Sequence, residues 1–365
     1  MPSSKLFQPI TIGEGLHLKH RVVLAPMTRF RATREQVIID LAAEYYAQRA
    51  STPGTLLISE VILIAARAGG MDNIPAIETS EQMAAWKKVT DAVHGKGSYI
   101  IAQLWAIGRT AHPDVLERDG FPLVGSSDIA LYGHAKPRPL TKKEIKDYVE
   151  LWAKAAQNAI EAGFDGVELH GSSGSLIDQF LQDVSNNRTD EYGGSVENRA
   201  RFVLEIIEAV VKAIGAKKVG LRLSPWSLYR DMRMKDPIPQ FSFLVSKIAE
   251  LYPDFGFLHL IEPTTSGFHD RVPEPGESND FLRDIWRPRP FIATGGFTRD
   301  SAIEHADKTG DLVGFGKLFI SNPDLPRRLK ANYPLTAYDR DTFYKVLSPD
   351  GYTDYPFADD LDVDM

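Results

Sequence analysis

The sequence contains no cysteine among its 365 residues. This absence excludes disulfides, thiolate metal ligands and cysteine nucleophiles, although it leaves the redox compartment open. Three well-known signatures are missing as well, namely the Walker A sequence, the GxGxxG fingerprint and the HExxH zinc motif. The chain is therefore a poor candidate for a P-loop nucleotide hydrolase, a Rossmann dehydrogenase or an HExxH metalloprotease, and we expect no metal site.

Long apolar runs and an excess of basic residues are also absent. No stretch approaches the roughly 18 apolar residues that a membrane span requires, and residues 1–15 lack the apolar core of a signal peptide. The formal net charge of -7 disfavours nucleic acid as a partner. We expect a cytoplasmic protein without membrane contact, a monomer or a homodimer, that binds a small molecule.

Short apolar runs alternate with amphipathic segments along the whole chain. Strands are predicted at Val22 to Ala25, Thr55 to Ser59, Ser98 to Gln103, Gly166 to Leu169, Lys218 to Leu223, Phe257 to Leu260, Pro290 to Ala293 and Leu312 to Gly314. Helices are predicted at Gln82 to His94, Lys142 to Ala162, Val196 to Ile214 and Gln240 to Leu251. Eight βα repeats predict a single (β/α)₈ TIM barrel domain over residues 1–365.

One segment interrupts this alternation. Residues 108–139, rich in Gly, Pro and Asp, follow the third predicted strand. An excursion from the carboxyl end of a barrel strand lies on the side where barrel enzymes build their active sites. We therefore expect this insertion to help cover the mouth of the barrel.

The fourth apolar run ends at the residue best placed for chemistry. It stops at His170 and continues as a Gly/Ser cluster that includes Ser173. A buried strand that ends in this way delivers a side chain to the rim of the barrel. The other histidines, among them His94 and His259, occupy ordinary helix, loop or strand positions and are expected to be structural.

Other strand ends carry polar groups that each allow two interpretations. Thr28 follows the first strand and either meets a carbonyl oxygen or caps a turn. Gln103 ends the third strand. Its side-chain amide either hydrogen-bonds to a ligand ring that has a donor and an acceptor side by side, or is buried with its hydrogen bonds made within the protein. Arg222 lies inside the fifth strand, where its charge needs either an anionic ligand or a buried carboxylate.

Glycine-rich turns follow the last two predicted strands. They read Thr294-Gly295-Gly296-Phe297 and Gly314-Phe315-Gly316-Lys317. Loops at these two positions of a barrel commonly bind phosphate, because glycines allow backbone amides to approach the anion. The pair favours a phosphorylated cofactor over plain turns.

The stretch from Gly166 to Phe202 resembles the old yellow enzyme family, flavin-dependent ene-reductases. Its loop SNNRTDEYGGSVENRARF matches that family almost residue for residue, and the similarity continues from LFQPI to YTDYPF. The resemblance implies FMN and NADPH as cofactors and an α,β-unsaturated carbonyl compound, an enone or enal, as substrate. The segment from Ala106 to Val115 is similar to fungal natural-product pathway members, which favours a tailoring enzyme for a bulky substrate.

The resemblance also assigns roles to individual residues. It implies that FMN is bound by Ala25, Pro26, Thr28, Gln103, Arg222, Gly295, Gly296, Gly316 and Lys317. It implies that the substrate meets Trp105, His170, Ser173 and Tyr352. The family usually has arginine at the position of Lys317. Here a lysine ammonium therefore replaces a guanidinium that could donate two parallel hydrogen bonds to a phosphate.

The departures from the family fall on the reactive groups. Asparagine is usual at Ser173 and tyrosine at Ser175, the family's proton donor. Ser173 is expected to donate one hydrogen bond to the substrate carbonyl beside His170, whereas the hydroxyl of Ser175 is a poor acid at neutral pH. The site could thus belong to a reductase protonated from elsewhere, to a flavin-dependent isomerase or dehydrogenase, or to a non-redox barrel that shapes a ligand for a pericyclic reaction.

Overall fold

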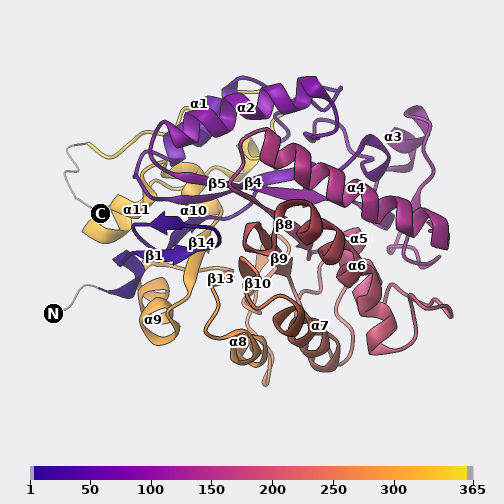
Figure 1. Cartoon of the computed structure of the whole chain (residues 1–365). Helices are drawn as coiled ribbons and strands as arrows, with labels where there is room; N and C mark the ends of the chain where they lie inside the picture. The colour runs from indigo at the N-terminus through magenta and orange to yellow at the C-terminus, as the bar shows by residue number, and fades with distance from the viewer. Residues whose placement is uncertain (1–3, 360–364) are drawn as a thin grey trace.

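The computed structural model describes residues 4–359 and residue 365. Its centre is a closed barrel of parallel strands, surrounded by helices (Figure 1). The barrel strands are β3 (Val22–Leu24), β4 (Leu56–Leu63), β5 (Tyr99–Trp105), β8 (Gly166–Gly171), β9 (Val219–Leu223), β10 (Phe257–Ile261), β13 (Phe291–Thr294) and β14 (Leu312–Phe315). All eight predicted strands are confirmed, and with them the TIM barrel.

The main helices follow the strands in the βα order that the sequence predicts. They are α1 (Leu41–Arg49), α2 (Ser80–His94), α4 (Lys142–Glu161), α6 (Val196–Ile214), α7 (Ile238–Leu251), α8 (Asp280–Trp286), α9 (Arg299–Thr309) and α11 (Leu325–Ala331). Helix α6 shows why the prediction succeeds. Ser195 caps its first turn by accepting from the amide of Asn198, and Phe202, Ile206 and Val210 bury one face completely.

The amino-terminal end of the barrel is closed by a hairpin of β1 (Ile10–Ile12) and β2 (Leu16–Leu18). Ile12 and Leu18 join the buried cluster inside the barrel, which includes Ile58 and Ile292. This apolar plug occupies the end opposite to the strand termini that carry His170 and Arg222. The chemistry is therefore confined to the carboxyl ends of the strands.

Smaller elements lie on the loops of that carboxyl-terminal side. They are α3 (Pro113–Arg118), β6 (Val124–Gly125), β7 (Arg138–Pro139), α5 (Leu176–Leu181), β11 (Thr265–Ser266), β12 (His269–Asp270) and α10 (Lys317–Ser321). The stretch between β5 and α4 contains α3, β6 and β7. Within the described part of the chain, none of residues 108–139 lines the cavity described below, and the position of this segment over the mouth stays a prediction.

No helix in the described residues is both long enough and apolar enough to cross a membrane. Among the same residues, no group of three or more His, Asp and Glu side chains is arranged to hold a metal ion.

Candidate active site

A cavity of about 380 Å³ opens at the carboxyl ends of the barrel strands. Its volume falls in the range of small-molecule sites. Of the residues singled out from the sequence, those that line it are Ala25, Pro26, Thr28, Gln103, Trp105, His170, Ser173, Arg222, Gly295, Gly296, Gly316 and Lys317. Ser175 and Tyr352 do not. The barrel thus gathers strand ends that are up to about 290 residues apart in sequence into one site, because parallel strands present their carboxyl ends on one rim.

Arg222 lines the cavity without an ion pair to any described residue. Its Nε is buried and has no hydrogen-bond acceptor. Burial lowers the pKa of the guanidinium, and the charge of Glu168 opposes that shift. Of the two interpretations of this arginine, the buried salt bridge is not formed. Its guanidinium therefore has hydrogen-bond donors available for an anionic or carbonyl group of a ligand.

Gln103 is oriented by a buried carboxylate. Its Nε2 donates to Glu168 at 2.7 Å, and because a carboxylate only accepts, this contact fixes which end of the amide faces inward. The other carboxylate oxygen accepts from Nδ1 of His259 at 2.6 Å. Burial lowers the pKa of His259, and the charge of Glu168 opposes that shift. The carbonyl oxygen and second N–H of Gln103 are left for a ligand with adjacent donor and acceptor atoms.

His170 is the last residue but one of β8 and lies beside Trp105, with its ring 6.1 Å from the indole. Burial lowers the pKa of the imidazole well below its ordinary value, and the nearby charge of Arg222 adds to the effect. The hydroxyl of Ser172 lies 3.3 Å from Nδ1. When that hydroxyl donates to Nδ1, the ring proton is on Nε2, and a neutral histidine in this tautomer can donate to a carbonyl oxygen.

Ser173 and Ser175 have different environments. Ser173 lines the cavity in a left-handed backbone conformation, with φ of +57°, and its amide donates to Oγ of Ser224. Ser175 is fully buried, and its hydroxyl donates to the backbone carbonyl of His170 at 2.6 Å. The structure therefore places Ser173 on the cavity and Ser175 outside it, with the Ser175 hydroxyl directed at the backbone.

Tyr352 also lies outside the cavity. Its ring is buried and stacks on Tyr45 at 4.2 Å, with the guanidinium of Arg31 over it at 4.8 Å. The carboxyl-terminal segment instead brings Phe343 and Tyr344 to the cavity. The stacking and the cation–π contact hold Tyr352 in the core, outside the residues that line the cavity.

The two glycine-rich turns meet at the end of the cavity next to α10. Gly295 and Gly296 have φ of +133° and +67°, values that favour glycine, and their amide N–H groups donate to no acceptor in the described part of the chain. Nζ of Lys317 lies 3.2 Å from the carboxylate of Asp270, and Oγ1 of Thr265 is buried without a partner. Free amides, a free hydroxyl and a lysine form a set of donors suited to a phosphate.

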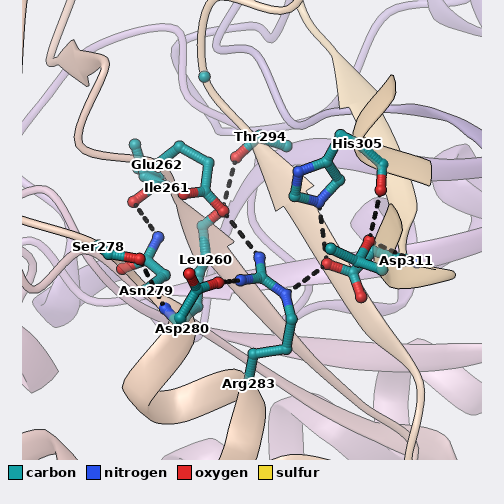
Figure 2. Close-up of polar contacts among 12 residues, drawn as sticks. Leu260, Ile261, Glu262, Ser278, Asn279, Asp280, Arg283, Thr294, His305 and Asp311 are labelled. Carbon is teal, nitrogen blue, oxygen red and sulfur yellow. Dashed lines mark hydrogen bonds and ion pairs between the residues drawn. The ribbon is translucent and has the colours of Figure 1, made fainter. Parts of the chain in front are cut away.

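A buried ion-pair cluster holds the strand ends behind this loop (Figure 2). Arg283 of α8 donates to Asp311 at 2.7 Å and to Glu262 at 3.1 Å, and it also pairs with Asp280. The amide of Glu262 donates to the carbonyl of Thr294 at 2.6 Å. One guanidinium therefore ties together the segments that follow β10 and precede β14, and it fixes the base of the Gly295 turn.

Comparison with known proteins identifies the chain. The profile of the "NADH:flavin oxidoreductase / NADH oxidase family" matches residues 5–336. The chain belongs to this family. The resemblance to old yellow enzymes is confirmed by the crystal structure of Old Yellow Enzyme from Pichia sp. AKU4542, which is 37% identical, with a TM-score of 0.90 over 98% of this chain and 94% of that one.

Two curated relatives from fungi are nearly half identical to this flavin oxidoreductase. "NADP-dependent oxidoreductase lnbE" of Aspergillus flavus is 49% identical over 98% of this chain and 97% of its own length. "Chanoclavine-I aldehyde reductase fgaOx3" of Penicillium roqueforti is 49% identical over 97% of each chain. The similarity to fungal pathway members that the sequence indicates is thereby confirmed.

FMN is the cofactor of this family, and the donors of the cavity fit it. The unpaired guanidinium of Arg222 and the oriented amide of Gln103 suit the polar edge of an isoalloxazine ring. The free amides of Gly295 and Gly296, together with Lys317, suit its phosphate. The contact of each residue with FMN stays a prediction.

Several lining residues escaped the sequence analysis. The aromatic wall includes Phe30, Tyr229, Phe268, Phe343 and Tyr344, and two cations, Arg230 and Arg340, lie near it. Most of these follow no strand directly. They belong to loops and to the carboxyl-terminal segment, and the only available signal was the aromatic content of residues 339–357.

Proposed function

We propose that this flavin oxidoreductase reduces the C=C bond of an α,β-unsaturated aldehyde or ketone with NADPH, as a tailoring step in a fungal biosynthetic pathway. The observation that carries the proposal is the buried imidazole of His170. It lines the same cavity as Arg222, whose Nε has no hydrogen-bond acceptor, and an apolar aromatic wall. One relative is named for reducing an aldehyde and another as NADP-dependent, so an enal and NADPH are the reagents to test first.

The residues of the chain would divide the work between the cofactor and the substrate. FMN, when bound, supplies hydride transfer between the nicotinamide and the substrate. Gln103 and Arg222 orient and polarise the ring, while His170 and Ser173 donate to the substrate carbonyl, where negative charge develops. Trp105, Phe343 and the other aromatic side chains exclude water and position an apolar substrate.

An isomerase is the second candidate, and the position of Ser175 favours it. Its hydroxyl is bonded to the carbonyl of His170, so the place of the family's usual proton donor holds no acid. A product that is isomeric with the substrate would then form without net consumption of NADPH.

Isotope labelling distinguishes the candidates. The yellow holoenzyme is first mixed anaerobically with NADPH, and loss of the flavin absorbance tests the redox role. Turnover of an enal with 4-deuterated NADPH in H₂O, and of unlabelled NADPH in D₂O, then locates both hydrogens. Reduction predicts deuterium from the nicotinamide at the β-carbon and from solvent at the α-carbon. A protein that binds no flavin, or a flavin that NADPH does not bleach, contradicts the proposal and favours a non-redox barrel.

A further inference from the structure

Arg230 lies in the loop between β9 and α7 and lines the cavity next to Ser173. Its aliphatic stem packs directly on the backbone of Gly174, where an added Cβ would lie 3.0 Å from Cβ of Arg230 and 3.2 Å from its Cδ. Its Nη1 lies 3.4 Å from the carbonyl oxygen of Ser173. The guanidinium therefore stands at the corner of the cavity where the side chain of Ser173 is short.

The backbone of this loop is held in an uncommon conformation. Arg230 and Asp231 have φ of +60° and +55°, although neither is glycine. The buried Arg109 donates through Nη2 to the carbonyl of Arg230 at 3.1 Å and lies 3.4 Å from that of Asp231. Non-glycine residues in the left-handed region cost free energy and persist where surrounding contacts fix them, often at functional sites. The insertion thus supports the site indirectly, through Arg109.

No carboxylate of the described residues pairs with Arg230. Its neighbours are the ring of Tyr229, 5.1 Å from Cζ, and the long contact with Ser173. By contrast, Arg233 of the same loop is paired with Glu274 and Glu277. Burial is the main cause that lowers the pKa of His170, followed by the charge of Arg222 and then by that of Arg230. Arg230 is thus close enough to the imidazole to interact with it electrostatically.

We propose that Arg230 is a further catalytic residue, whose guanidinium donates a hydrogen bond to the carbonyl oxygen of the substrate beside His170. This inference rests on the proposed function. As hydride bonds to the β-carbon, the C=C π pair forms a double bond between the α-carbon and the carbonyl carbon, and the C=O π pair moves onto oxygen. The enolate so formed takes a proton from solvent at the α-carbon, which restores the carbonyl. NADPH supplies the hydride through the flavin and leaves as NADP⁺. A fixed cation at that oxygen stabilises charge that is absent from the ground state.

Two substitutions and one control separate this role from simple packing. Arg230→Ala removes the donor, Arg230→Lys keeps the charge, and Lys235→Ala removes an exposed cation from the same loop. In anaerobic stopped flow, we expect reoxidation of the reduced enzyme by an enal to slow about 100-fold in Arg230→Ala. Reduction by NADPH should stay within a few-fold of wild type. Arg230→Lys and added guanidinium ions should each restore part of the lost rate, and Lys235→Ala should behave as wild type.

A binding measurement tests the same oxygen site without turnover. 4-Nitrophenol presents an ionisable oxygen whose phenolate absorbs visible light, and its pKa on the oxidised enzyme can be read by titration. We expect the bound phenol to ionise at lower pH on the wild type than on Arg230→Ala, by about one pKa unit. An unchanged pKa, together with wild-type reoxidation in Arg230→Ala, would overturn the role of Arg230. Failure of NADPH to reduce the wild-type flavin would instead count against the proposed function, and the phenol titration would still decide whether Arg230 stabilises an oxyanion.

Discussion

The hydroxyl of Ser175 donates to the backbone carbonyl of His170 over 2.6 Å, within the turn that links β8 to α5. The two residues are therefore joined through the main chain rather than through a shared ligand. This bond closes the turn that presents His170 and Ser173 to the cavity. It also means that the residue at the family's proton-donor position has a structural task in this protein.

Ser175→Ala should leave turnover nearly unchanged and lower the stability. The lost hydroxyl leaves the carbonyl of His170 without this donor, and one such buried hydrogen bond contributes about 1 kcal/mol to the free energy of unfolding. Urea unfolding of the holoenzyme and steady-state kinetics with an enal measure the two effects. Ser173→Ala is the matched control, since its side chain lines the cavity and its loss should reduce kcat. A large loss of kcat in Ser175→Ala at unchanged stability would contradict this assignment.

Arg222→Met should weaken FMN binding by about 10- to 100-fold, because a charge-assisted hydrogen bond contributes about 1.5 to 3 kcal/mol. The same change should not destabilise the apoprotein, since it removes a half-buried cation that has no ion pair within the described residues. Quenching of FMN fluorescence gives the dissociation constant, and thermal unfolding of the apoprotein gives the stability. The FMN affinity of Arg222→Lys should lie between those of the wild type and Arg222→Met. Equal FMN affinity in wild type and Arg222→Met would exclude a contact between Arg222 and the cofactor.

Asp270→Asn should tighten the binding of FMN but not that of riboflavin. The carboxylate of Asp270 lies 3.2 Å from Nζ of Lys317, and an incoming phosphate would share that ammonium with a like charge. Removing one nearby charge from a partly exposed site is expected to change the affinity several-fold, and more at low ionic strength. Titrations of the apoprotein with both flavins provide the measurement. An equal change for riboflavin would mean that Asp270 acts elsewhere than at the phosphate.

Glu60→Gln should remove a pH dependence of the stability. Burial raises the pKa of Glu60 in β4 from 4.5 to about 7, and its Oε1 has no partner. Because the folded state holds this proton more tightly than the unfolded state, the contribution of Glu60 to stability falls as pH rises from 4.5 to 7. It stays low above that pH. The expected loss is about 3 kcal/mol, since one pKa unit corresponds to about 1.4 kcal/mol.

Denaturant unfolding of wild type and Glu60→Gln at pH values of about 5 and about 8 tests this expectation. The wild type should lose more stability between the two pH values than the variant does. Parallel behaviour of the two proteins would place the ionisation of Glu60 outside this range.

The local sequence pattern was enough to predict the barrel and the polar residues at the ends of its strands. Apolar runs that stop at Gln103, His170 or Thr294 predict strands with a polar terminus, and closure of eight such strands forces these termini onto one rim. The side chains that line the cavity from its loops were not predictable in this way. Arg230 enters because Arg109, 121 residues away, holds its backbone at positive φ.

The choice between two tyrosines shows where the sequence reaches its limit. Tyr344 and Tyr352 lie eight residues apart in one aromatic segment, and nothing local distinguishes them. Tyr45 and Arg31, some 300 residues away, bury Tyr352 and leave Tyr344 to the cavity. The sequence by itself determined the strands, their order and the polar groups at their ends, because periodicity and capping act over a few residues. Only the tertiary structure decided which loop side chains line the cavity, because that depends on packing between segments that are distant in the sequence.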